Sequence, residues 1–194
     1  IIILTLLLSS FISFLTLIYS YIISDFSLIN VFQNSHSSKP ILYKISAAWG
    51  NHEGSMLLWI LVLTIFNYFL FKVLYKTDLN FFSKTLETQG LIIFSFILFT
   101  ILTSNPFEKI IPTPIDGLGF NPILQDPALA IHPPLLYVGY VGLSAAFSIG
   151  IAVLGADRSQ NISWYKLMKP FVLISWSFLT IGIAVGSMWA YYEL

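Results

Sequence analysis

The sequence contains no cysteine and few charged residues. Without cysteine the chain has no disulfide framework, no thiolate metal site and no redox thiol. Only 9% of the residues are charged, and nine Lys and Arg balance nine Asp and Glu, so the formal net charge is zero. This balance removes any whole-chain electrostatic attraction to nucleic acid, and we expect no nucleic-acid partner.

Apolar residues dominate what is present. Hydrophobic residues make up 57% of the 194 residues, and the mean hydropathy is +0.83. A soluble domain is much less apolar and more charged, so we predict an all-α integral membrane protein with one membrane domain over residues 1–194. Segments long enough to cross a ~30 Å hydrocarbon core predict about five transmembrane helices, at 1–23, 55–71, 86–103, 134–154 and 170–191.

The basic residues predict the orientation, because they gather on the cytoplasmic side of a membrane or its organellar equivalent. Six of the nine lie in two connections that a five-span model puts on one side: Lys72, Lys76, Lys84, Arg158, Lys166 and Lys169. We therefore expect the N-terminus inside and two long outer loops, about 24–54 and 104–131. All three histidines, His36, His52 and His132, then fall on the outer face.

His132 is the residue most suited to metal chemistry. It lies in NPILQDPALAIHPPLLYVGYVGLSAAF, residues 121–147, where polar residues lead into an apolar segment. Proline is tolerated in the first turn of a helix, so Pro133 and Pro134 predict a helix start, with His132 extended just ahead of it. An imidazole there could face a cavity and bind iron or zinc. Alternatively, His132 caps the helix or hydrogen-bonds a loop carbonyl.

Two further segments contribute aromatic and glycine residues to the outer face. In WGNHEGSMLLW, residues 49–59, Trp49 suits the membrane interface, while His52 and its neighbour Glu53 point apart on a helix and make a poor metal pair. We interpret this segment as mainly structural, seating the second span and helping to wall a cavity. In GSMWAYYEL, residues 186–194, Gly186 permits close helix packing, and Trp189 begins an aromatic rim suited to a flat apolar ring that carries iron.

These motifs together closely resemble one family. WGNHEGSMLLW, TSNPF, NPILQDPALAIHPPLLYVGYVG and GSMWAYYEL, in this order and spacing, resemble the N-terminal part of CcmF, a haem-ligating membrane protein of cytochrome c maturation. A weaker similarity extends to haem-handling proteins that share a tryptophan-rich "WWD" segment. The resemblance implies that His132, in the family's HPP motif, is an axial ligand to haem iron. We accordingly predict a haem site that comprises His132 as the metal ligand, Pro133, Asp126, Trp189, Trp49 and His52.

The resemblance also implies partners and a location. In the family, b-type haem passes from the chaperone CcmE to an outer tryptophan-rich platform and is joined to the thiols of a CxxCH apocytochrome c. The platform, its second histidine and the histidine pair of a resident haem b follow the segment at which this chain stops. We therefore expect a C-terminal CcmF piece, CcmE-like and CcmH-like proteins and apocytochrome c as partners, and no activity of the chain alone.

The expected location is the mitochondrial inner membrane, with the functional face toward the intermembrane space, or the bacterial inner membrane, facing the periplasm. Two other classes of function make different demands on the sequence. An ion-translocating subunit would place acidic, basic or histidine residues within its spans, and the apolar cores of the five spans, which in the third is Gly90 to Thr103, contain none. A non-catalytic structural subunit of a respiratory or maturation assembly stays open as the alternative, and it would make no use of His132.

Overall fold

The computed structural model describes residues 1–119, 125–155 and 163–193. The described helices, in chain order, are α1 (Ile2–Ile22), α2 (Ile29–Asn34), α3 (Ile41–Ala47), α4 (His52–Leu74), α5 (Leu79–Thr103), α6 (Pro127–Leu154) and α7 (Trp164–Glu193). Five of them are long and apolar enough to cross a membrane, namely α1, α4, α5, α6 and α7. The predicted all-α membrane fold with five spans is confirmed.

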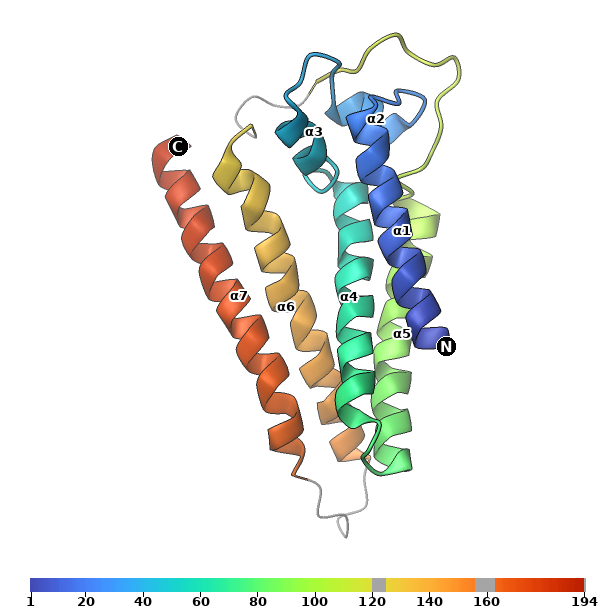
Figure 1. Ribbon diagram of the computed structural model, residues 1–194, viewed down its shortest axis with the longest axis vertical. Coiled ribbons are helices and arrows are strands. Elements are labelled where there is room, and N and C mark those ends of the chain that lie inside the picture. The colour runs from blue at the N-terminus through green and yellow to red at the C-terminus, as the bar shows by residue number, and fades with distance from the viewer. Residues whose placement is uncertain (120–124, 156–162, 194) are drawn as a thin grey trace.

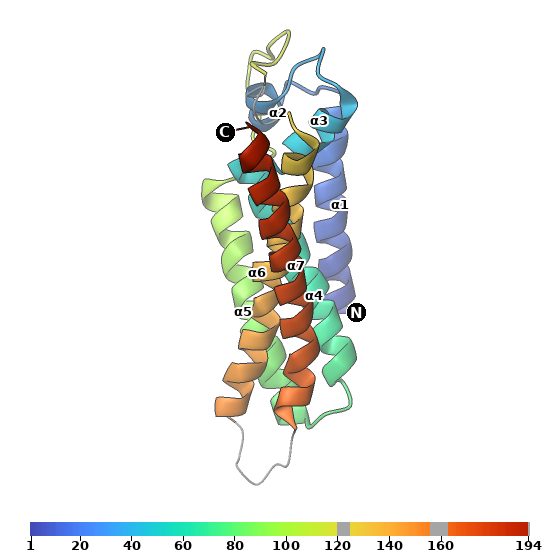
Figure 2. The same ribbon diagram turned by 90° about the vertical axis from the view of Figure 1, so that its left-hand side faces the viewer.

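The long helices form one elongated bundle. In Figure 1, α7 lies at one side, α6 and α4 in the middle, and α1 and α5 at the other side. Helix α4 is the best-buried span, because it packs against α1, α5 and α6, while α7 packs mainly along α6. Figure 2 shows that α2, α3 and the two long connections gather at one end of the bundle. We call this end the loop end.

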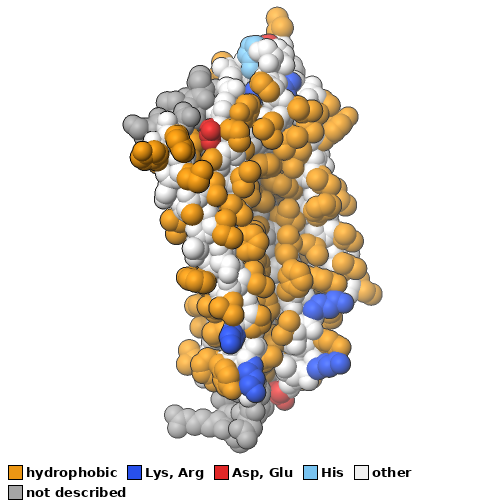
Figure 3. Space-filling model, turned by 60° about the vertical axis from the view of Figure 1, so that its left-hand side comes forward, with side chains coloured by type: hydrophobic (Ala, Val, Ile, Leu, Met, Phe, Trp, Pro, Cys, Tyr) orange, Lys and Arg blue, Asp and Glu red, His pale blue; other side chains and the backbone are white. Residues whose placement is uncertain are grey.

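The surface fits a bilayer. Hydrophobic side chains cover the middle of the face in Figure 3, and several lysine side chains lie toward the end opposite the loop end. Large apolar side chains such as Ile12 and Trp176 are about three-fifths exposed, at 60% and 63%, as expected for lipid-facing positions. Lys84 of α5 donates a hydrogen bond to the carbonyl of Gly155, which follows α6, so the start of α5 and the end of α6 are joined at this lysine-bearing end. Arg158 lies outside the described residues.

Helices α4, α5, α6 and α7 all begin before the residues expected; α5, for example, begins at Leu79 rather than at 86. Two of these starts concern the prolines. Helix α6 begins at Pro127, so Pro133 and Pro134 lie inside it, and α7 begins at Trp164, with Pro170 inside. The prediction that His132 precedes the helix is therefore wrong. Asp126 replaces the prolines as the start signal: its carboxylate accepts a hydrogen bond from the Ala128 N–H at 2.8 Å, which is N-cap geometry.

A buried polar network anchors the first long connection, between α1 and α4. The Tyr21 hydroxyl donates to the Asn30 side-chain oxygen at 2.7 Å, and the Asn30 amide donates to Asn51 at 2.7 Å and to Glu53 at 3.1 Å. The Asn51 side-chain oxygen also accepts from the Gly54 N–H at 2.8 Å, which caps α4. Tyr21 is fully buried and Asn30 nearly so. Such a satisfied network holds α1, α2 and α4 in one arrangement.

Hydrogen bonds join the second long connection, between α5 and α6, to the first. The Ile29 N–H donates to the Glu108 carbonyl, and the Ile110 N–H to the Ser27 carbonyl, both at 2.9 Å. Farther on, the Ser37 hydroxyl and N–H donate to the Asp116 carboxylate at 2.6 and 2.9 Å, and these bonds lower the pKa of Asp116 to about 2. Asp116 is therefore ionised at neutral pH, and the proline-rich connection is ordered over its described part.

Candidate functional site

His132 lies between α6 and α7 near the loop end. Its side chain is half-buried, and Nδ1 is 2.7 Å from the carbonyl oxygen of Gly182. A Cβ placed on Gly186, one turn further along α7, would stand 2.4 Å from His132 Cε1. The absence of a side chain at Gly186 therefore makes room for the imidazole. The carbonyl partner belongs to a neighbouring helix rather than to the loop that the sequence suggested as one alternative.

This hydrogen bond determines the tautomer of the imidazole. A carbonyl oxygen only accepts, so Nδ1 carries the proton and donates, and in the neutral ring Nε2 keeps its lone pair. Metal-bound histidines usually donate their other ring N–H to a carbonyl or a carboxylate in this way. The imidazole is thus oriented as an iron ligand would be, through Nε2.

Trp49 and Asp126 support the same part of α6 from outside. Trp49 Nε1 donates to the Ala130 carbonyl at 2.9 Å, and its ring stacks on Phe14 with centroids 6.2 Å apart. Asp126 caps the start of α6, as described above. Pro133 lies within the helix beside His132. The structure therefore groups His132, Pro133, Asp126 and Trp49 around the first two turns of α6, with Trp49 and Asp126 bonded to the backbone.

His52 lies in a different place. Its Nε2 is 2.9 Å from the Ser104 hydroxyl, and its ring meets Phe99 edge-on with centroids 6.4 Å apart. Both contacts belong to the end of α5, whereas His132 contacts α7, on the other side of the bundle in Figure 1. The structure does not bring the two imidazoles together. Among the described residues no group of three or more His, Cys, Asp or Glu could hold a metal ion.

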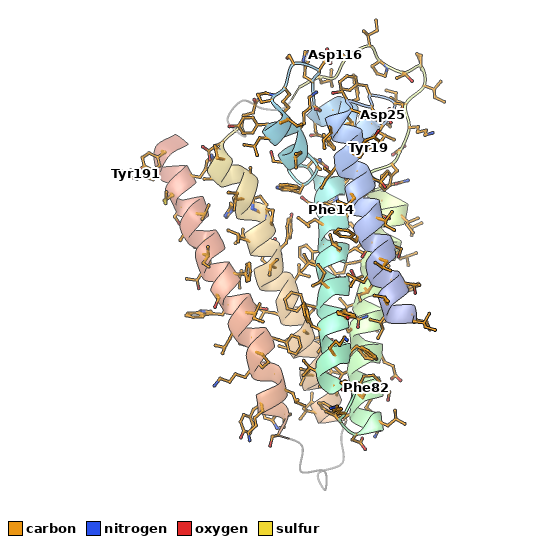
Figure 4. All side chains as sticks on the ribbon, in the orientation of Figure 1. Phe14, Tyr19, Asp25, Phe82, Asp116 and Tyr191 are labelled. Carbon is orange, nitrogen blue, oxygen red and sulfur yellow. The ribbon has the colours of Figure 1, made fainter. Side chains whose placement is uncertain are left out.

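Trp189 differs from the aromatic residues that follow it. Tyr191 and Tyr192 are 82% and 75% exposed, and Figure 4 shows Tyr191 at the outer end of α7. Trp189 is half-buried, and its buried Nε1 has no hydrogen-bond partner among the described residues. A buried donor without an acceptor is costly. Trp189 lies one turn beyond Gly186 on the same face of α7.

The residues present therefore fit one side of a haem site. They supply an oriented imidazole nitrogen and an indole donor that has no partner in the described part of the chain. Two features were not predicted from the sequence: the bond from Trp49 to Ala130 and a polar clamp within the spans. In that clamp Gln89 of α5, fully buried, donates to the Ser144 hydroxyl at 3.0 Å and accepts from the Ser148 hydroxyl at 2.9 Å. The signal for the clamp was one glutamine in an apolar segment and two serines spaced four apart.

Replacing Gly186 with alanine is expected to displace the imidazole. The added methyl would overlap His132 Cε1 and Nδ1, at 2.4 and 2.7 Å, so the bond to Gly182 breaks or α7 moves away. We expect a stability loss of about 1–3 kcal/mol, measured by thermal unfolding of the detergent-solubilised protein. Gly90→Ala in α5 is the matched control, because a Cβ there meets nothing within 4 Å. Equal unfolding temperatures for the two variants would contradict the packing described here.

Comparisons with known proteins bear on the family. The model of the family described as "Cytochrome C assembly protein" matches residues 49–194. The cytochrome c-type biogenesis protein CycK of Rhizobium meliloti is 50% identical over 94% of this chain and 27% of its own length. CcmF of Escherichia coli is 42% identical over 94% of this chain and 28% of its own length.

A solved structure shows the same fold. The structure titled cytochrome c haem lyase CcmF matches with a TM-score of 0.83 and 28% identity, over 97% of this chain and 29% of that one. The chain thus spans little more than a quarter of the length of these relatives. The resemblance drawn from the four motifs is confirmed: the chain is similar to part of the CcmF and CycK proteins, and it belongs to the cytochrome c assembly protein family.

Proposed function

We propose that this chain is a component of a cytochrome c haem lyase and supplies one axial histidine, His132, to haem held for attachment to apocytochrome c. The observation that supports the proposal is the bond between His132 Nδ1 and the Gly182 carbonyl, which leaves Nε2 as the coordinating atom. Haem is the substrate here, and its iron accepts the nitrogen lone pair. The relatives' names, cytochrome c-type biogenesis protein and cytochrome c haem lyase, point to the same process.

The chain's own residues have distinct tasks in this proposal. His132 orients the haem plane through its ring, and the Gly182 carbonyl holds the imidazole correctly turned by accepting from Nδ1. The indole N–H of Trp189 donates to an anionic group of the substrate, for which a haem propionate is suited. A second axial ligand and the tryptophan-rich platform come from a C-terminal CcmF segment or subunit. The CcmE-like donor, the CcmH-like protein and apocytochrome c act on the same assembly.

The location follows from the charge distribution. Lys72, Lys76, Lys84, Lys166 and Lys169 lie at or near the short connections, so this end faces the cytoplasm or the mitochondrial matrix. The loop end then faces the periplasm or the intermembrane space. His132 thus lies near the face at which an exported apocytochrome would arrive. A purely structural role in the assembly is the second candidate, since the helices pack whether or not His132 binds iron.

The test is replacement of the matching segment of E. coli CcmF by this chain, which aligns with 183 residues at 42% identity. If the proposal is right, the chimera restores covalent haem in c-type cytochromes to a strain that lacks CcmF. The measurement is haem staining of denatured membrane and periplasmic proteins, with immunoblots of the chimera and of one apocytochrome. A chimera that accumulates in the membrane at the normal level yet yields no covalent haem would contradict the proposal.

A further inference from the structure

Pro134 removes a hydrogen bond from the turn that carries His132. In an α-helix the carbonyl of residue i accepts from the N–H of residue i+4, so Ala130 should pair with residue 134. Proline has no N–H, and Pro134 lies inside α6. Ala130 is only 6% exposed, so water does not readily replace the lost donor. The helix can continue through this position only if another group donates to the Ala130 carbonyl.

Trp49 provides that donor from a distant part of the chain. Its indole Nε1 is 2.9 Å from the Ala130 oxygen, across 81 positions of sequence. Because Nε1 is the only hydrogen-bonding group of the indole, this bond uses the whole polar capacity of the side chain. Trp49 therefore acts on the α6 backbone through its N–H.

The donor is itself held in place. The Trp49 carbonyl accepts from the Ser55 hydroxyl at 2.8 Å, and its N–H donates to the Ser46 carbonyl at 3.1 Å. The ring stacks on Phe14 of α1, and Asn51 caps α4 two residues later. These contacts tie the indole to α1, α3 and α4. Its N–H is thus a fixed reference point for the start of α6.

His132 follows Ala130 by two residues and reaches in another direction. The Ala130 carbonyl is bound from the α3–α4 junction, while the His132 imidazole is bound to Gly182 of α7. The same turn of α6 is therefore held on both sides. If the Ala130 carbonyl lost its donor, the turn would be free to unwind or shift, and the 2.7 Å contact between Nδ1 and Gly182 would be the first to change.

We infer that Trp49 is a positioning residue for His132: its N–H replaces the hydrogen bond that Pro134 removes and so fixes the imidazole against α7. This inference deepens the proposed function. Only its consequence for haem binding rests on that function, because the positioning itself is a property of the chain without haem. The inference predicts a coupling between residues 49 and 134. The Trp49 donor is needed only while residue 134 lacks an N–H.

The test is a double-mutant cycle in the full haem-free assembly, with wild type, Trp49→Phe, Pro134→Ala and the double variant. The main readout is ¹⁵N NMR of labelled histidine, with the His132 signals assigned by their loss in His132→Gln. We expect wild-type Nδ1 to be protonated and Nε2 unprotonated. Trp49→Phe should speed exchange of the Nδ1 proton with D₂O by about tenfold, the scale of one lost hydrogen bond. Adding Pro134→Ala should return the exchange rate to within about twofold of the wild-type rate.

Two further variants keep the test decisive. Trp176→Phe, which removes an exposed indole from α7, should leave the His132 signals unchanged. If Trp49→Phe fails to assemble, β-(3-benzothienyl)alanine at position 49 keeps the ring shape and replaces the N–H with sulfur. The inference is overturned if wild-type Nδ1 is unprotonated, if Trp49→Phe leaves the exchange rate as in wild type, or if Pro134→Ala does not rescue it.

The same four proteins, together with His132→Gln, separate this inference from the proposed function. In the haem-loaded assembly, the absorption spectrum and reduction potential of platform haem should shift in Trp49→Phe and return in the double variant. Suppose that Trp49→Phe speeds exchange and Pro134→Ala reverses this effect, while His132→Gln leaves the haem spectrum unchanged. The positioning inference then stands and the ligand role of His132 is wrong. If His132→Gln abolishes the haem spectrum but the cycle shows no coupling, the ligand role stands and the positioning inference falls.

Discussion

Replacing His132 with alanine is expected to abolish both haem binding at the platform and the formation of covalent cytochrome c. The change removes Nε2, the nitrogen left free by the bond between Nδ1 and the Gly182 carbonyl. Loss of a residue that merely supports a metal ligand costs roughly 10- to 100-fold in affinity or activity, so loss of the ligand itself should cost at least as much. The measurements are the haem absorption spectrum of the purified assembly and the yield of haem-stained cytochrome c.

The assembly should still form in this variant. His132 is half-buried, and alanine leaves Gly182 and Gly186 with space rather than with a clash. Added imidazole can enter that space, so partial recovery of the haem spectrum is expected at millimolar imidazole. His36→Ala is the matched control, since His36 lies on the outer surface 3.5 Å from Asp116. Retention of haem and of holocytochrome in His132→Ala would leave the structural-subunit role as the better description.

Replacing Gly54 with alanine is expected to give the largest loss of stability. A Cβ at this position would lie 1.8 Å from the Ala48 carbonyl oxygen and 2.9 Å from its carbon. Backbone atoms cannot turn aside as a side chain can, so α4 must move away from the end of α3. That movement also breaks the cap in which Asn51 accepts from the Gly54 N–H. We expect a loss of about 3 kcal/mol or more, combining overpacking with a broken buried network.

The effect should be visible as a lower unfolding temperature and a lower level of protein in the membrane. The matched control is Gly150→Ala in α6, where the nearest atom to an added Cβ is Met168 Cε at 3.8 Å, an ordinary contact. Because Asn51 is hydrogen-bonded to Tyr21 and Asn30, the variant should also loosen the first long connection, between α1 and α4, and increase its proteolysis. If Gly54→Ala unfolds at the same temperature as Gly150→Ala, the close contact with Ala48 is incorrect.

The class of the protein was readable from composition and hydropathy. Spans of about 20 apolar residues are a local property, because every helix in a bilayer must be apolar along its own length. The motifs around Trp49, His132 and Gly186 also identified the family without reference to any contact. The helix starts were not readable in this way: Pro133 and Pro170 predict helix starts, yet α6 and α7 extend through them.

The arrangement of the site depended on contacts that no local pattern contains. A proline pair usually marks a helix start because its missing N–H groups are tolerated there. In α6 the pair lies in the interior, since an indole 81 positions away satisfies the Ala130 carbonyl. Likewise, the sequence predicts Asn30 and Asn51 only as residues of a loop, whereas in the structure both are hydrogen-bonded to Tyr21. His52 faces α5 and His132 faces α7 because helix packing, not sequence order, sets the direction of each side chain.

The sequence by itself thus determined a five-span membrane protein of the CcmF type with its histidines near the loop end. The tertiary structure alone decided that His132 is helical, that Gly182 orients its ring and that Trp49 supports its backbone. The physical reason is that hydropathy and helix length depend on each segment separately. A hydrogen bond between helices depends on which faces meet, and that is settled only when the whole bundle packs.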